Sequence, residues 1–209
     1  MPEQIMSVIM CGGRGRRMGG REKPLVEVLG KPLIKYAIEA VEGCQEITGL
    51  DFVTSINTPL TTRFLRQMGY EPFIGSGGGF LNDLSEYLAK KGEGSYLVVS
   101  CDVPTMTTYH IQEALRISQR HGEEYLMYVL PLESVRGLSK NPTIIERGGA
   151  HFQPAGLRLI RKKSVGPQNH SNPKLVVLHF RELGMNVNTL DDIKAAESYL
   201  KALRDLAKS

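Results

Sequence analysis

The densest group of chemically active residues lies in the segment CGGRGRRMGGREKP, residues 11–24. Gly12, Gly13 and Gly15 follow an apolar stretch, and glycines at such a place let backbone N–H groups approach a ligand closely. Five basic residues stand against one acid in this segment: Arg14, Arg16, Arg17, Arg21 and Lys23 against Glu22. Backbone donors beside cations suit a triphosphate, so the segment is predicted to bind NTP phosphates.

Two commoner phosphate-binding motifs do not fit this segment. Gly15 and Gly20 have the spacing of a Walker A motif, but Arg21 and Glu22 follow where Lys and Ser or Thr are required. The dinucleotide fingerprint GxGxxG fails because Met18 stands in place of its third glycine. A flexible glycine turn beside a solvated basic face is the alternative interpretation.

Two other segments offer oxygen ligands for a metal ion. Asp102 follows the apolar run YLVVS at 96–100, and Asn186 and Asn188 alternate on an extended segment, so they face the same way. Transfer between two phosphate anions needs a divalent metal, and Mg²⁺ prefers carboxylate and carbonyl oxygens. As alternatives, Asp102 caps a helix or turn, and Asn186 only hydrogen-bonds its own loop.

The elements that must position these residues follow from hydrophobic periodicity. Strands are predicted at 4–10, 50–56, 70–74, 96–100 and 125–130, and shorter ones at 143–145, 157–160 and 174–180. Helices are predicted at 31–41, from Thr58 with this residue as cap, at 80–90, at 111–120 and after the capping box of Thr189 and Asp192. Residues 162–173 are expected to form a surface loop. The alternation predicts an α/β fold with a single, Rossmann-like, mostly parallel sheet and helices on both faces. With no repeat or linker evident, residues 1–209 are expected to form a single domain.

Composition narrows the function further. The 209 residues are 41% hydrophobic and 23% charged, as in ordinary globular proteins. The net charge of +4 is matched by the 11–24 segment alone, which argues against a nucleic-acid-binding surface. No apolar run is long enough to span a bilayer, and the N-terminus lacks signal-peptide features. Cys11, Cys44 and Cys101 have no metal or pairing pattern, so reduced thiols in a cytoplasmic protein are expected.

The segment GGRGRRMGGREKPL resembles the signature GGxGxRMG…KPL of nucleotidyltransferases that activate sugar phosphates and other phosphorylated metabolites. The resemblance implies a fold of the nucleotide-diphospho-sugar transferase (glycosyltransferase-A) type. It implies that Arg17 and Lys23 contact NTP phosphates and serve catalysis. SCDVP is similar to the family's DxP segment, so Asp102 would hold Mg²⁺. MNVNT is similar to NxNTxxD, so Asn188 would be the second metal ligand.

Within this group the sequence looks closest to the archaeal-type GTP:adenosylcobinamide-phosphate guanylyltransferases. SGGGFLNDL at 76–84 resembles their SGxGYxxDL, and Pro154-Ala155-Gly156 resembles their PAG segment. Molybdenum cofactor guanylyltransferases, which share GGRGRRMGG, KPL, DxP, the Asn-Pro-Thr at 141–143 and NxNT, are the alternative. From another class, a non-catalytic GTP- or RNA-binding module is opposed by the low aromatic content of 7%.

This resemblance implies GTP and a phosphorylated corrinoid as substrates. Guanine is expected near the 75–84 loop, where backbone groups of Gly77, Gly78 and Gly79 can match its edge. Asp83 is the side-chain candidate for guanine, although Asp83 and Asn82 suit a cap of the 80–90 helix equally well. Gly156 and Asn186 complete the expected nucleotide-binding set. The 162–174 loop is open to three uses: a corrinoid contact, a contact in a homodimer, or neither.

Overall fold

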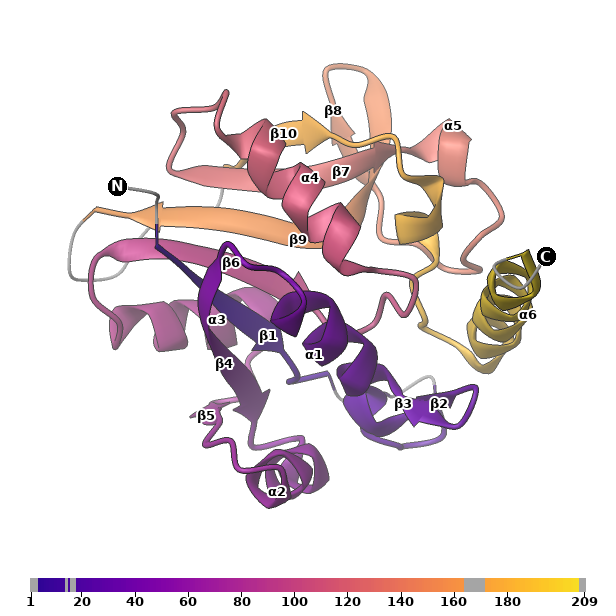
Figure 1. Ribbon diagram of the computed structural model, residues 1–209, viewed down its shortest axis with the longest axis horizontal. Coiled ribbons are helices and arrows are strands. Elements are labelled where there is room, and N and C mark those ends of the chain that lie inside the picture. Colours follow the sequence, from indigo (N-terminus) through magenta and orange to yellow (C-terminus); the bar gives the residue numbers. More distant parts are fainter. Residues whose placement is uncertain (1–3, 14, 16–17, 164–171, 207–209) are drawn as a thin grey trace.

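The fold is described from a computed structural model that covers residues 4–13, 15, 18–163 and 172–206 (Figure 1). The strands of the main sheet are β1 (Ile5–Met10), β4 (Ile47–Ser55), β5 (Phe73–Gly75), β6 (Gly94–Ser100), β7 (Tyr125–Pro131), β8 (Ile145–Arg147), β9 (Ala150–Lys162) and β10 (Lys174–Val177). A small separate sheet pairs β2 (Glu27–Val28) with β3 (Lys31–Pro32). The α-helices are α1 (Leu33–Glu42), α2 (Pro59–Gln67), α3 (Phe80–Ala89), α4 (Thr108–Ser118), α5 (Leu132–Val135) and α6 (Leu190–Leu206), with short 3₁₀ turns η2 (Lys23–Leu25) and η3 (Arg181–Gly184).

The main sheet has eight strands in the order β10-β7-β9-β6-β1-β4-β5, with β8 paired to β9. β1 runs parallel to β4 and β6, β4 to β5, and β7 to β10. β9 is antiparallel to its neighbours β6, β7 and β8. The predicted α/β fold with a mostly parallel sheet is therefore confirmed, with β9 as the reversed strand.

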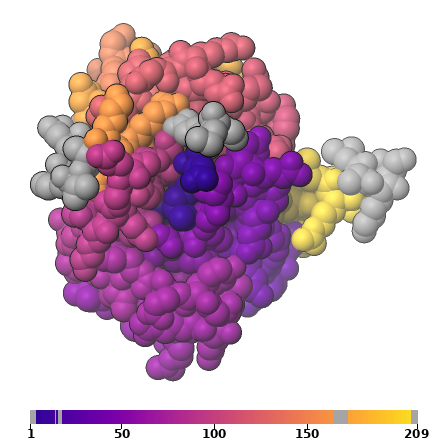
Figure 2. Space-filling view, turned by 60° about the vertical axis from the view of Figure 1, so that its left-hand side comes forward, coloured from indigo at the N-terminus to yellow at the C-terminus, as the bar shows by residue number. Residues whose placement is uncertain are grey.

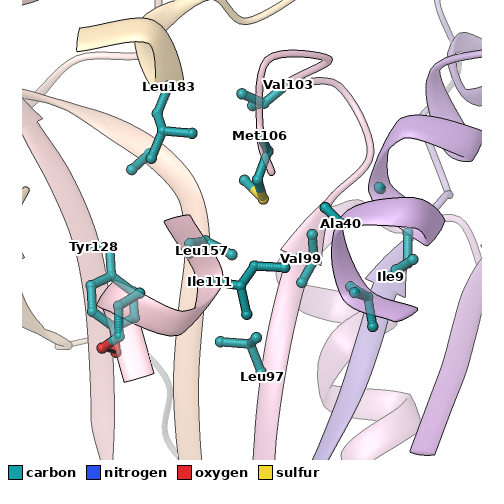
Figure 3. Packing of buried hydrophobic residues seen from close by; sticks show 14 of the residues in the cluster. Ile9, Ala40, Leu97, Val99, Val103, Met106, Ile111, Tyr128, Leu157 and Leu183 are labelled. Carbon is teal, nitrogen blue, oxygen red and sulfur yellow. Dashed lines mark hydrogen bonds between the residues drawn. The ribbon is translucent and has the colours of Figure 1, made fainter. Parts of the chain in front are cut away.

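Helices cover both faces of the sheet, as predicted. On one face, α1 and α4 pack on a cluster that includes Ile9, Leu97, Ile111 and Tyr128 (Figure 3). On the other face, α3 packs its buried residues over β1 and β6, where Val8 and Val98 lie side by side. Within the described residues, no helix is long and apolar enough to cross a membrane.

β9 is much longer than the strand predicted at 157–160. Its inner stretch contains Pro154 and Gly156, which in a sequence indicate a turn. In the structure Gly156 has φ +81°, and the pairing of β9 with β7 shifts register between Met127 and Val129. The irregularity is thus a bulge inside one strand and not its end.

Lys162 was expected to begin a surface loop, but it ends β9 and is buried. Its ammonium donates to the carbonyl of Leu88 at 2.6 Å and to that of Lys91. It therefore binds carbonyl groups at the C-terminal end of α3, where a helix has unpaired acceptors. Of the expected loop, residues 164–171 lie outside the described chain.

Candidate active site

A cavity of about 260 Å³ opens at the carboxyl ends of β1 and β6, the edge where open α/β sheets bind ligands. Figure 2 shows the opposite edge of the sheet, where the indigo residues at the start of β1 lie centrally on one face, close to the orange surface of β9. The cavity is lined by Met10, Gly12, Gly13, Lys23, Pro24, Gly77, Gly79, Phe80, Asp83, Ser100, Cys101 and Asp102. It unites the glycine loop, the 75–84 loop and the strand-end aspartate that the sequence singled out.

Three predicted residues meet beside this cavity. The ammonium of Lys23 forms an ion pair with Oδ2 of Asp102 and donates to Oδ1 of Asn188 at 2.8 Å. Asn186 Nδ2 donates to Oδ1 of Asp102 at 3.2 Å, and Asn188 Nδ2 donates to Oδ1 of Asn186 at 2.6 Å. Asn186 therefore bonds both Asp102 and Asn188, and the four side chains form one network.

The network has the chemistry of a magnesium site. Oxygen atoms of Asp102 and Asn188 converge on a single cation, the Lys23 ammonium, and both are hard oxygens of the kind Mg²⁺ prefers. Across the described residues no group of three or more His, Cys, Asp or Glu side chains could hold a metal. The residues present fit an ion that takes its remaining ligands from phosphate and water.

The segment carrying the asparagines is fixed to the rest of the site at two points. Val187 N donates to the carbonyl of Asp102 at 2.9 Å, which joins the two segments through their backbones. The carboxylate of Asp192 accepts from Asn188 N at 3.0 Å, from Thr189 N and Oγ1 at 2.8 Å each, and from Lys140 N at 2.9 Å. Burial would raise the pKa of Asp192, but these hydrogen bonds outweigh it and leave the pKa below its ordinary value. The predicted capping box of Thr189 and Asp192 is confirmed, and it also holds Asn188.

Glu22 anchors the glycine loop on the other side. Its carboxylate accepts from Leu60 N at 2.8 Å, from Thr61 N at 2.6 Å and from Thr61 Oγ1 at 2.7 Å, at the N-terminus of α2. Thr58 is the N-cap residue of α2, as predicted, but its hydroxyl accepts from Ser55 N and makes no cap bond. In the sequence Glu22 stands out only as the one acid among five basic residues. Its position directly before Lys23 is the one sequence feature that indicates a role for it.

The glycine loop closes tightly on itself. Gly15 has φ +57°, and a Cβ there would lie 1.9 Å from the carbonyl oxygen of Arg21, so a side chain is excluded. Gly13 packs against the aliphatic part of Lys23, with 3.7 Å between its hypothetical Cβ and the Lys23 Cβ. Arg17, together with Arg14 and Arg16, lies outside the described residues, and its phosphate contact stays a prediction.

Asp83 supports the second glycine loop. It is buried in the first turn of α3, and its Oδ1 accepts from Gly77 N at 2.8 Å. The N-cap position of α3 is Gly79, and this bond joins Asp83 to the loop before the helix. Asn82 donates to Ser76 Oγ at 2.9 Å. Asp83 lines the cavity, and its contact with guanine stays a prediction. Gly78 lies against the side chain of Asn82, and its contact with guanine stays a prediction too.

Gly156 is closely approached by side chains of this protein, whereas the sequence predicted a close approach to the nucleotide. A Cβ at this position would be 3.0 Å from Val103 Cγ2 and 3.2 Å from Met106 Cε, both in the chain that follows Asp102. Its lack of a side chain thus lets β9 pack closely against the segment that follows Asp102. Gly156 is not among the residues that line the cavity, and its contact with a ligand stays a prediction.

Comparison with known proteins identifies the family. Residues 7–160 match the family described as the MobA-like NTP transferase domain, and the chain belongs to this family. It is therefore a nucleotidyltransferase. Two solved structures share the fold: a CMP:2-keto-3-deoxy-manno-octonic acid synthetase complexed with CTP (TM-score 0.66, 12% identity, 95% of this chain and 99% of that one), and a 4-diphosphocytidyl-2C-methyl-D-erythritol synthase from Anaerococcus prevotii (TM-score 0.62, 15% identity, 96% and 100%).

Two curated relatives are closer in sequence. An adenosylcobinamide-phosphate guanylyltransferase from Methanocaldococcus jannaschii is 31% identical over 206 residues, which cover 93% of this chain and 97% of the relative. A molybdenum cofactor guanylyltransferase from Shewanella woodyi is 32% identical over 128 residues, which cover 59% of this chain and 62% of the relative.

Proposed function

We propose that this protein transfers GMP from GTP to adenosylcobinamide phosphate, forming adenosylcobinamide-GDP and pyrophosphate in cobalamin biosynthesis. The observation that carries the choice of acceptor is the extent of similarity to the Methanocaldococcus relative, which runs through 93% of this chain and 97% of that one. Similarity to the molybdenum relative stops at 59% of the chain. The meeting of Lys23, Asp102 and Asn188 beside the cavity supports nucleotidyl transfer.

The reaction needs no nucleophile from the protein. An oxygen of the acceptor's phosphate attacks the α-phosphorus of GTP and forms the new P–O bond, while the bond from that phosphorus to the bridging oxygen breaks and pyrophosphate leaves. A phosphate monoester is largely dianionic at pH 7, since its second pKa is about 6, so no general base is required. The protein's contribution is to position two anions and to neutralise their charge.

Charge neutralisation falls to the network beside the cavity. Asp102 and Asn188 would hold Mg²⁺, and Asn186 would orient both through its amide. When bound, the ion offsets negative charge on the phosphates. The Lys23 ammonium bonds the side-chain oxygens of Asp102 and Asn188, the same two residues that would hold the ion. Its side chain is flexible, so the ammonium can turn to the phosphates when the ion is bound. Arg17 is proposed to assist from the same loop.

The thiols fit a cytoplasmic enzyme. Cys11, Cys44 and Cys101 are free and buried. Burial raises the pKa of Cys11 well above its usual value, so this thiol stays protonated and unreactive. Free thiols are typical of reducing compartments, and we place the protein in the cytoplasm.

An acceptor assay tests the proposed function. The protein is incubated with α-labelled GTP, MgCl₂ and one of three acceptors: adenosylcobinamide phosphate, adenosylcobinamide without the phosphate, or molybdopterin. Label is expected in a corrinoid product with the first acceptor alone, with one pyrophosphate released per product. Labelled product with molybdopterin only would contradict the cobalamin assignment and favour the molybdenum cofactor reaction.

A further inference from the structure

Arg158 is a cation that the mechanism above does not use. It lies on β9, where it is paired with Val98 of β6 and Met127 of β7. Val98 packs under α3 and precedes by two residues Ser100, which lines the cavity. The backbone of Arg158 therefore lies two residues along the sheet from the cavity-lining Ser100. It is separated from β1 and the glycine loop by β6.

The surroundings of this guanidinium are aromatic. Its central carbon lies 4.3 Å from the centroid of the Phe80 ring, and Phe80 lines the cavity. Nη1 donates to the hydroxyl of Tyr125 at 3.0 Å. Burial lowers the pKa of Arg158, and the contact with Tyr125 partly offsets this. Arg66 and Arg116 each pair with a glutamate, whereas no Asp or Glu of the described residues lies within 4.0 Å of Arg158.

A partly buried cation without a counter-ion costs stability. Removing a guanidinium from water is unfavourable, and one hydroxyl and one ring face compensate only in part. Phe80 is also the first residue of α3, a helix of ten residues, so the positive end of the helix dipole lies at the same wall. The first turn of α3 already holds the carboxylate of Asp83, so the cation of Arg158 is the feature that favours an anion next to Phe80.

We propose that Arg158 binds the phosphate of the acceptor. This proposal rests on the proposed function. Lys23 and the glycine loop line the cavity on the β1 side. Arg158 is not itself a lining residue, but from the β9 side it contacts Phe80, which is. Donor and acceptor phosphates would then face each other across the cavity. In-line displacement requires such an opposed arrangement. The planar fork of an arginine suits a phosphate monoester because it can donate two hydrogen bonds at once.

The test uses Arg158→Met, with Lys174→Met as the matched control. Methionine fills a mostly buried position and carries no charge that needs solvation, so the melting temperature is expected to stay or rise. Lys174 lies on β10 with its side chain 52% exposed. A purely structural role for Arg158 would instead lower the melting temperature and weaken every ligand alike.

Binding is measured by calorimetry with Mg²⁺ and a saturating GTP analogue that cannot release pyrophosphate, using adenosylcobinamide with and without its phosphate. The wild type and Lys174→Met are expected to prefer the phosphorylated corrinoid. Arg158→Met is expected to bind it about 10- to 100-fold more weakly, with unchanged affinity for the unphosphorylated form and for the GTP analogue.

Three results would overturn the assignment. If Arg158→Met keeps the preference for the phosphorylated corrinoid, Arg158 is not its phosphate site, and the proposed function stands. If the variant loses affinity for the GTP analogue instead, Arg158 serves the nucleotide. If the wild type shows no preference between the two corrinoids, both the subsite and the proposed acceptor are wrong.

Discussion

At the scale of single residues, Glu22 shows how one side chain can fix the position of its neighbour, Lys23, for which we propose a role in the reaction. Its carboxylate binds the N-terminus of α2 through Leu60 and Thr61, and the next residue in the chain is Lys23. An acid is favourable there because the first N–H groups of a helix are unpaired and the dipole is positive. The loop that carries Lys23 is thereby fixed to a helix across the site.

Replacing Glu22 by Ala is expected to raise the KM for GTP about tenfold, since Lys23 loses its fixed position. The lost cap should also cost about 1 kcal/mol of unfolding free energy. Steady-state kinetics and urea unfolding measure both effects. Glu22→Gln keeps one of the two acceptor oxygens and should recover part of the affinity. Glu27→Ala, at an exposed position on β2, is the control. A KM for GTP that stays at the wild-type value in Glu22→Ala would limit Glu22 to a stability role.

The residues that the sequence identified share a kind of position. Lys23, Asp102 and Asn188 each stand in a short motif next to a strand or helix end, so local pattern predicts both the residue and its place at one sheet edge. Glu22 and Arg158 could not be found in this way. What gives them a role is a contact with an element distant in sequence, α2 for Glu22 and α3 for Arg158.

At the scale of elements, β9 and the start of α6 decide the geometry of the site. The sequence predicted the buried, continuous strands β1, β6 and β7 because their apolar runs are unambiguous. β9 was underestimated because Pro154 and Gly156 hide a strand with a bulge. Its reversed direction depends on pairing with β6 and β7, which no local pattern encodes.

The capping box of α6 makes part of the stability depend on pH. The pKa of Asp192 is lower in the folded chain than the ordinary value of 3.8, so folding favours its ionised form. This stabilisation is present above about pH 4 and is lost as the pH falls through the lower folded pKa. In Asp192→Asn we expect a loss of about 2 kcal/mol at pH 7 that shrinks toward pH 3, measured by urea unfolding.

The neighbouring Asp191 is the control for this prediction, because it is exposed in the same helical turn. Asp191→Asn should leave the pH dependence as in the wild type. A stability difference between Asp192→Asn and the wild type that is the same at pH 3 and pH 7 would contradict the account of Asp192.

At the scale of the whole molecule, the fold joins segments from both ends of the chain at one cavity. Lys23, Asp102 and Asn188 are 79 and 86 residues apart along the sequence, yet they form one network. β1 and β6 are adjacent parallel strands, so the segments after them must emerge at the same edge, and Val187 N bonds the carbonyl of Asp102. The charge of residues 11–24 equals the net charge of the whole chain, +4, and Lys23 of this segment lies in the network.

The central claim is that this network carries out nucleotidyl transfer. The most direct test is the rate of label transfer from α-labelled GTP to adenosylcobinamide phosphate in a single turnover, compared among the wild type, Lys23→Ala and Asp102→Ala. Each variant is expected to lose at least about 100-fold in rate, since Lys23 would act on the phosphates directly and Asp102 would hold the Mg²⁺ ion that offsets their charge. Circular dichroism should show that both remain folded. Transfer at the wild-type rate in either folded variant would contradict the account.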